Sequence, residues 1–221
     1  VALDGFSLEG SSRKGLRYTR NKLQREGCSF AVKPVEEVAA LLPVLREISD
    51  AWLQSKKTAE KGFSLGSFRE DYIMHFPVAV VMKENQIVAF ANIWTSGGKE
   101  EISPDLMRYR PGAPEDVMEY LFIELILYGA REGYRWFNLG MTPLAGLENR
   151  PLAPLWSRIG ASIFRHGEHF YNFQGLRNYK EKFDPTWRGR FLAIPGGLSL
   201  PRNLLDVAKL ISGGLKDLIM K

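Results

Sequence analysis

The sequence contains very few of the residues that form disulfides and metal sites. Its 221 residues include one cysteine, Cys28, and three histidines. A single cysteine excludes a disulfide within the chain and is typical of a reducing compartment. His166, Glu168 and His169 lie close in sequence, but His75 is remote and no zinc-type ligand spacing is present. We therefore expect no metal site.

Long apolar runs and familiar catalytic motifs are also missing. No apolar stretch reaches the length of about 18 residues that a membrane-spanning helix needs. The sequence has no Gly-x-Ser-x-Gly elbow, no Cys–His signature, no Walker motif and no dinucleotide fingerprint. It begins with Val1 and shows no signal peptide, so we interpret it as a fragment or a processed piece. A hydrophobic content of 45% is typical of a globular core.

Acidic residues are absent from one strongly basic segment near the start of the chain. The net charge of +5 favours a polyanionic partner such as RNA or an anionic membrane surface. Leu16 and Leu23 are seven residues apart, which predicts a helix with a thin apolar seam and a basic exterior. Such a helix is either solvated or contacts phosphates. Its basic residues are Arg13, Lys14, Arg17, Arg20, Lys22 and Arg25.

The hydrophobic pattern predicts an α/β domain with a mixed sheet. We expect Pro43 to break or kink the first long helix, and residues 53–71 to form a loop. The predicted strands cover 30–33, 76–82, 86–94, 100–109, 136–140, 161–173 and 188–194. The predicted helices after the basic one cover 35–52, 114–131, 151–158, 175–183 and 201–221. The last helix has one apolar face, so it either docks on its own domain or lies on anionic lipid.

One helix face near the end of the domain carries an unexpected lysine. A helix starting near Gly175 places Leu176, Tyr179, Lys180 and Phe183 on one face, at i, i+3, i+4 and i+7. A lysine among apolar side chains is costly unless it has a function or a partner. The alternative is that the alkyl stem packs while the ammonium reaches water.

Asp105 and Arg108 stand near the end of the third meander strand, just before the long helix. Loops and strand ends of this kind often carry functional residues. In a regular strand the two side chains point to opposite faces, so they converge only if the strand bulges or ends between them. The alternative interpretation is an ordinary surface aspartate and an arginine that binds no phosphate.

The loop after this strand leads to a comparison with the acetyltransferase (GNAT) fold. A meander followed by a helix at this point resembles that fold, which holds the coenzyme A pyrophosphate on backbone N–H groups at the helix N-terminus. Here Pro111 and Pro114 remove two donors, and the usual glycine pattern is absent. The scaffold therefore resembles an acyltransferase with a disrupted coenzyme A loop. Arg108 and Arg110 can still hold a phosphate by their side chains.

Four segments carry a more specific resemblance, which covers nearly the whole chain. They are residues 5–30, SPDLMR at 103–108, FNLGMTPLAGL at 137–147 and FYNFQGLRNYKEKF at 170–183. In these segments the chain resembles the C-terminal catalytic region of bacterial aminoacyl-phosphatidylglycerol synthases, the multiple peptide resistance factors. The resemblance implies three parts: a basic linker helix at 1–28, a GNAT-like catalytic domain at 29–195 and a C-terminal amphipathic helix at 196–221.

The resemblance also implies an activity. The family transfers a lysyl or alanyl group from aminoacyl-tRNA, a co-substrate, to a glycerol hydroxyl of phosphatidylglycerol, and it needs no cofactor. The modified lipid gives resistance to cationic antimicrobial peptides. The catalytic region lies at the cytoplasmic face of the bacterial inner membrane. In the family it follows a membrane domain that flips the product and a first GNAT-like domain. The resemblance implies that this chain lacks the membrane domain and most or all of the first GNAT-like domain.

The resemblance assigns roles to individual residues. Asp105 and Arg108 match the functional pair of the family, and Lys180 matches its functional lysine. The basic helix becomes a candidate tRNA contact, and the tail helix a candidate lipid contact. The residues expected to bind substrate are Arg110, Asn138, Met141, Glu148, Arg177 and Tyr179. For Asn138, Met141 and Glu148 the alternative is an ordinary capped turn.

Two other functions remain open from the sequence. One is an N-acetyltransferase that uses acetyl coenzyme A, which the proline-containing loop disfavours. The other is a non-catalytic module that binds tRNA or membrane, with binding that weakens as salt increases.

Overall fold

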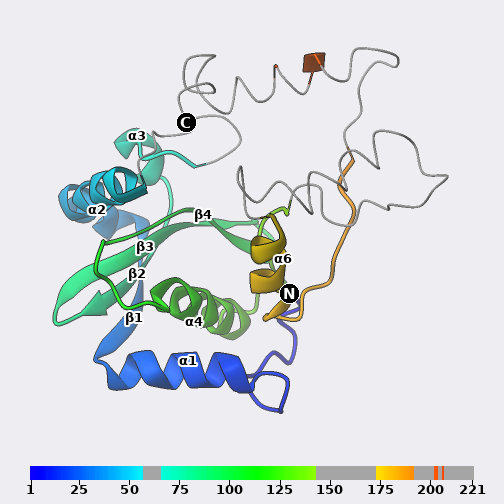
Figure 1. The fold of residues 1–221 in the computed structure, drawn as a ribbon. Helices are drawn as coiled ribbons and strands as arrows, with labels where there is room; N and C mark the ends of the chain where they lie inside the picture. The colour runs from blue at the N-terminus through cyan, green and yellow to red at the C-terminus, as the bar shows by residue number, and fades with distance from the viewer. Residues whose placement is uncertain (57–65, 143–172, 192–201, 204–205, 207–221) are drawn as a thin grey trace.

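The computed structural model describes residues 1–56, 66–142, 173–191, 202–203 and 206 (Figure 1). Most of the predicted elements are present, including the basic helix, the meander and the long helix. In chain order the elements are α1 (Lys14–Arg25), β1 (Cys28–Lys33), α2 (Val35–Lys56), α3 (Glu70–Ile73), β2 (Val78–Lys83), β3 (Gln86–Thr95), β4 (Glu101–Tyr109), α4 (Val117–Arg131), β5 (Trp136–Phe137) and α6 (Phe173–Glu181).

The five strands form one mixed sheet in the order β1-β2-β3-β4-β5. The first four strands run antiparallel, and β5 pairs with β4 in parallel. Glu84 and Asn85 join β2 to β3 with φ angles of 51° and 63°, because a two-residue hairpin needs positive φ at both positions. The parallel unit β4-α4-β5 added to an antiparallel meander confirms the predicted GNAT-like α/β fold.

Helices cover both faces of the sheet (Figure 1). Strand β2 alternates between two cores: Val78 and Val80 pack with α2 and α3, while Ala79 and Val81 pack on the α4 side. Helix α1 lies against α4, and its Leu16 and Leu23 are buried there, as the sequence predicts. Phe183, just beyond α6, belongs to the same core. The layers are therefore α2–α3, the sheet, and then α4 with α1 and α6.

Pro43 does not break the first long helix, which is a correction to the sequence prediction. Helix α2 runs without interruption from Val35 to Lys56, with Pro43 on its exposed side. Water can solvate the carbonyl that a proline leaves without a donor, and buried Leu42, Leu45 and Ile48 hold the helix on the sheet. The predicted loop at 53–71 is also partly wrong, because its two ends belong to α2 and α3.

Five other predicted elements differ from the structure or lie wholly or partly outside its described residues. The strand predicted at 136–140 is regular only at Trp136 and Phe137. Residues 188–191 form no strand, and Phe173 begins α6 rather than ending a β segment. The predicted helix at 151–158, most of the segment 161–173, residues 192–194, Glu148 and nearly all of the tail helix lie outside the described residues.

Candidate active site

Strands β4 and β5 separate after a short contact, and the sequence-predicted site lies where they part. Their parallel pairing covers only Glu101 with Trp136 and Ile102 with Phe137. Two further contacts follow: the Asn138 N–H donates to the Ile102 carbonyl, and Ser103 Oγ donates to the Asn138 carbonyl. Beyond them β4 continues beside β3 alone. The ends of strands in α/β sheets are where ligands commonly bind.

Strand β4 contains a bulge at Asp105 and Leu106. Its pairing with β3 passes from Pro104 to Met107 while β3 advances only from Ile93 to Ala91. At the irregular position the Leu106 N–H donates to the side-chain oxygen of Asn92 at 2.7 Å. The extra residue changes which face the following side chains occupy.

The bulge places Asp105 and Arg108 on the same face of the sheet. Asp105 contacts Tyr72 of α3, and Arg108 contacts Trp52 of α2. Both partners lie on the α2–α3 side, whereas Met107 packs on the α4 side. The condition under which the two side chains converge is therefore met.

Asp105 is held by a short chain of hydrogen bonds. The Tyr72 hydroxyl donates to Asp105 Oδ2 at 2.6 Å, and Trp94 Nε1 donates to the Tyr72 oxygen at 2.9 Å. Burial, together with the Asp105 carboxylate, raises the pKa of Tyr72 to about 12, so its hydroxyl remains a donor at neutral pH. No pattern in the sequence pointed to Tyr72 or Trp94, because 33 residues separate Tyr72 from Asp105.

Gly66 lies directly against the Asp105 carboxylate. A Cβ atom at this position would lie 2.4 Å from Asp105 Oδ2 and 2.9 Å from the Leu106 Cβ. Distances this short cannot be accommodated unless the backbone or the carboxylate moves. Only glycine therefore allows the chain to pass this close to Asp105.

Two arginines near the end of β4 make contacts with α2. The Arg108 guanidinium lies 4.3 Å from the centroid of the Trp52 ring, a cation–π distance, and donates to the Met107 carbonyl at 2.9 Å. Arg110 pairs with Glu47 at 2.6 Å and, by that hydrogen bond, lowers the pKa of the glutamate. Both arginines therefore contact α2, Arg108 through Trp52 and Arg110 through Glu47.

Lys180 is the most unusual charged residue of the site. Only 6% of the residue is exposed. Its Nζ donates to the carbonyls of Gly140 and Met141, both at 3.0 Å, and pairs with no carboxylate of the described residues. Burial lowers its pKa to about 8. The inward orientation of Lys180 is therefore confirmed. Its ammonium binds backbone carbonyls, whereas the snorkelling alternative predicted that it reaches water.

The backbone that receives Lys180 is shaped by Asn138. The Asn138 Oδ1 accepts from the Gly140 N–H at 2.7 Å, and its Nδ2 donates to Glu101 at 2.9 Å. The Asn138 side chain thus caps the turn at Gly140, as the alternative interpretation predicted. Met141 as a whole residue is 65% exposed, although its carbonyl binds Lys180.

Two predicted substrate-binding residues on α6 have structural contacts. The Tyr179 ring packs edge-on against Phe122 of α4, and burial raises the pKa of its hydroxyl. Arg177 pairs with Glu181 at 3.3 Å and stacks over Trp187. Neither contact tests a role in substrate binding, which stays a prediction.

The basic residues of α1 are less available than the sequence suggests. Arg20 pairs with Glu124 of α4 at 2.7 Å, and Lys22 pairs at 2.8 Å with Asp116, which directly precedes α4. Arg13 and Arg17 donate to backbone carbonyls of the segment before α1. Lys14 and Arg25 pair with no carboxylate in the described part of the chain, and a shallow hollow on their helix is lined by Tyr18, Asn21, Gln24 and Arg25. A tRNA contact on α1 stays a prediction. Fewer of the basic residues of α1 are available for it than the sequence alone indicates.

The described residues contain neither a metal-type cluster nor a helix suited to span a membrane. Among the residues that the structure describes, no three His, Cys, Asp or Glu side chains come together as a metal site. None of the helices in those ranges is long and apolar enough to cross a membrane.

Sequence comparisons identify relatives of the whole chain. Residues 1–194 match the family described as phosphatidylglycerol lysyltransferase, C-terminal. The phosphatidylglycerol lysyltransferase of Bacillus subtilis is 43% identical over 219 residues, and that of Staphylococcus aureus is 32% identical over 212 residues. These alignments cover 98% and 96% of this chain but 25% of each relative. The chain therefore spans about a quarter of the length of these relatives.

Two solved structures share the fold closely. The C-terminal domain of a putative lysylphosphatidylglycerol synthetase from Agrobacterium fabrum is 41% identical with a TM-score of 0.82, covering 98% of this chain and 65% of that one. The L-PGS structure from Bacillus licheniformis is 43% identical with a TM-score of 0.78, covering 96% of this chain and 63% of that one. The chain belongs to the family of phosphatidylglycerol lysyltransferase C-terminal domains.

Proposed function

We propose that this chain is the catalytic part of an aminoacyltransferase that moves a lysyl or alanyl group from aminoacyl-tRNA to a glycerol hydroxyl of phosphatidylglycerol. The observation that carries the proposal is Lys180, a buried ammonium on two carbonyls where β5 leaves the sheet. Perturbed, buried titratable groups of this kind concentrate at functional sites. The family and the position of Asp105 and Arg108 on one face of the sheet give further support.

The reaction is an ester exchange that needs alignment and charge stabilisation. The glycerol hydroxyl attacks the acyl carbon, the ribose oxygen of the tRNA leaves, and the hydroxyl proton ends on that oxygen. Negative charge develops on the acyl oxygen in between. No covalent enzyme intermediate is required, because the aminoacyl ester is already activated.

Lys180 is suited to stabilise that negative charge. An ammonium has three N–H donors, and the carbonyls of Gly140 and Met141 take two of them. The third can be donated to the acyl oxygen in the transition state or to the lipid phosphate. Arg108 can supply the other charge, because its stacking on Trp52 holds the guanidinium plane in place.

Asp105 is suited to bind a cation or to direct a hydroxyl. Tyr72 occupies its Oδ2, while its Oδ1 accepts no hydrogen bond from the residues that the structure describes. That oxygen can accept from the ammonium of the aminoacyl group or from the attacking hydroxyl. A carboxylate that is already oriented by a tyrosine loses little freedom when the substrate binds.

The larger protein context is part of the proposal. We place the chain at the cytoplasmic face of the bacterial inner membrane, after a first GNAT-like domain and a flippase domain of the same protein. In that setting α1 contacts the tRNA and the tail at 196–221 contacts anionic lipid. The aminoacylated lipid then lowers the affinity of the envelope for cationic antimicrobial peptides.

The test is label transfer from charged tRNA to phosphatidylglycerol vesicles, with lysyl-tRNA and alanyl-tRNA compared side by side. Transfer from one of them establishes the reaction and the amino acid. Binding of tRNA and vesicles without transfer from either would support the non-catalytic alternative for the chain alone. A thermal shift with coenzyme A would support the acetyltransferase alternative.

Replacement of Gly66 by alanine is expected to lower transfer about tenfold or more, because the new Cβ displaces the Asp105 carboxylate. The overpacking should also cost about 1–3 kcal/mol of unfolding free energy. Transfer rates and urea unfolding measure the two effects. Gly97→Ala is the matched control, because a Cβ added at Gly97 would meet nothing within 4 Å. Equal transfer by both variants would contradict the placement of Gly66.

A further inference from the structure

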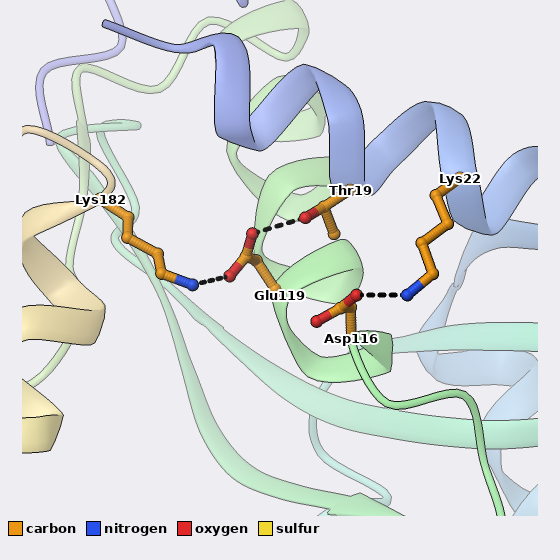
Figure 2. A network of polar contacts seen from close by, with 5 residues as sticks. All are labelled: Thr19, Lys22, Asp116, Glu119 and Lys182. Atoms are coloured by element: carbon orange, nitrogen blue, oxygen red, sulfur yellow. Dashed lines mark hydrogen bonds and ion pairs between the residues drawn. The ribbon is translucent and has the colours of Figure 1, made fainter.

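Glu119 of α4 is a buried carboxylate that joins two other helices. Only 7% of the residue is exposed. Its Oε1 accepts from Thr19 Oγ1 of α1 at 2.8 Å, and its Oε2 accepts from Lys182 Nζ at 2.5 Å (Figure 2). Lys182 follows the last residue of α6. One side chain therefore ties α1 and the end of α6 to the same turn of α4.

The Lys182 contact lies next to the proposed reaction centre without touching it. Lys182 is two residues after Lys180, and the neighbouring Tyr179 and Phe183 pack on Phe122 of α4. Two residues along a helix turn the side chain to nearly the opposite side, so Lys180 reaches Gly140 and Met141 instead. The position of the Lys180 ammonium thus depends on how the end of α6 sits on α4.

We propose that Glu119 is a positioning residue that couples α1 to Lys180 through the end of α6. This inference rests on the proposed function for its catalytic consequence. A buried carboxylate that loses its cation is strongly disfavoured, so the contact of Glu119 with Lys182 constrains α6 more than an exposed pair does. Anything that shifts α1, including a bound partner, then changes the position of α6 on α4 and with it the position of Lys180.

A second ion pair, between α1 and the start of α4, provides a matched control. Asp116, at the start of α4, pairs with Lys22 of α1 at 2.8 Å (Figure 2). Its side chain is 34% exposed, compared with 8% for Glu119. Within the described ranges, neither Lys22 nor Asp116 forms a hydrogen bond or ion pair with α6. Loss of the Asp116 pair should leave α1 in place, because Arg20 still pairs with Glu124 and Thr19 still donates to Glu119.

The first experiment measures Lys180 itself and needs no transferase activity. The chain is treated with an amine-acylating reagent across pH 6 to 11, and modification of Lys180 is followed by peptide mass spectrometry. In the wild type, half-maximal reactivity is expected near the lowered pKa of about 8. In Glu119→Gln, which keeps an acceptor for Thr19 but loses the charge, the midpoint should move up toward the ordinary value of 10.5.

The direction of that shift separates displacement from simple electrostatics. Removing a nearby negative charge lowers the pKa of a lysine, whereas moving the lysine into water raises it. Glu119 meets Lys182 just after α6, Thr19 from α1 and, through its charge, Tyr179 of α6, while Lys180 pairs with no carboxylate of the described residues. An upward shift in Glu119→Gln, with no shift in Asp116→Asn, therefore indicates that Lys180 has moved.

Three further variants complete the test. Lys182→Met breaks the same contact from a side chain that is 53% exposed, so it carries the test if Glu119→Gln does not fold. Lys182→Arg keeps the charge and should keep the wild-type midpoint. Thr19→Val removes only the contact from α1 and should shift the midpoint in the same direction by a smaller amount.

Transfer kinetics supply the second readout. Glu119→Gln and Lys182→Met should each lower kcat about tenfold with KM changed less than about twofold, because Lys180 is misplaced while substrate contacts remain. The inference is overturned if both variants keep the wild-type midpoint, or if Asp116→Asn shifts it equally. If the wild type itself transfers nothing, the proposed function fails while the reactivity of Lys180 still tests the coupling.

Discussion

Lys180→Met is expected to reduce the rate of aminoacyl transfer by about a hundredfold or more, because it removes the donor aimed at the developing negative charge. Lys180→Ala should lose a similar amount. Methionine fills a similar space, so the packing of α6 on α4 is preserved. Initial rates with charged tRNA and phosphatidylglycerol vesicles measure the loss. Lys33→Met is the control, because Lys33 makes only an exposed i,i+4 pair with Glu37.

Lys180→Met should also be more stable to unfolding than the wild type at neutral pH. The folded pKa of Lys180 is about 8, below its ordinary value of 10.5, because burial disfavours the ammonium. Between these values the unfolded chain binds more protons, so the wild type becomes more stable as the pH rises from 8 to 10.5. Lys180→Met lacks this dependence. Urea unfolding should show a higher unfolding free energy for Lys180→Met than for the wild type at pH 7, and a smaller difference at pH 10.

The pH dependence of transfer distinguishes two roles for Lys180. If the ammonium stabilises charge, the rate falls as the pH rises through about 8, and the variant loses that limb. If the neutral amine removes the hydroxyl proton, the rate rises through the same pH. Transfer by Lys180→Met at the wild-type rate would show that the inward-facing lysine has no catalytic role.

The sequence predicted the elements whose pattern is local. The alternation of apolar residues located the hairpin of β2 and β3, and the 3.6-residue period located α4 and the inner face of α6. Lys180 stood out because one helical turn defines its neighbours. Pro43 was misread because the surrounding leucines, rather than the proline alone, decide whether the helix continues.

Contacts between distant segments could not be predicted in the same way. The bulge depends on Asn92 replacing a backbone acceptor, and no spacing reveals such an exchange. The partners of Arg20 and Lys22 lie 104 and 94 residues away, so a helix of uncompensated charge and a helix paired with acids look identical in sequence. Tyr72 was overlooked because its short helix stands in a polar stretch.

Asp105→Asn is expected to lower transfer by about a hundredfold, through the loss of one charge at constant shape. The asparagine oxygen can still accept from Tyr72, so the fold and the side-chain position should be kept. Tyr72→Phe keeps the charge but loses the bond that orients it, and a smaller loss of about tenfold is expected. Steady-state rates of the two variants measure these effects. A larger loss in Tyr72→Phe than in Asp105→Asn would contradict a charge-based role for Asp105.

Asp105 can bind the ammonium of the aminoacyl group or direct the glycerol hydroxyl. A comparison of two donor substrates, each with the wild type and with Asp105→Asn, distinguishes these roles. If the carboxylate binds the ammonium of the aminoacyl group, a tRNA esterified with the matching acyl group that lacks the amine should be a poor donor for the wild type. Asp105→Asn should use that donor about as well as the wild type does, because the lost contact is absent from both. If Asp105 directs the glycerol hydroxyl, the variant should lose the same factor with either donor. The ratio of these two losses therefore assigns the carboxylate to the acyl group or to the lipid.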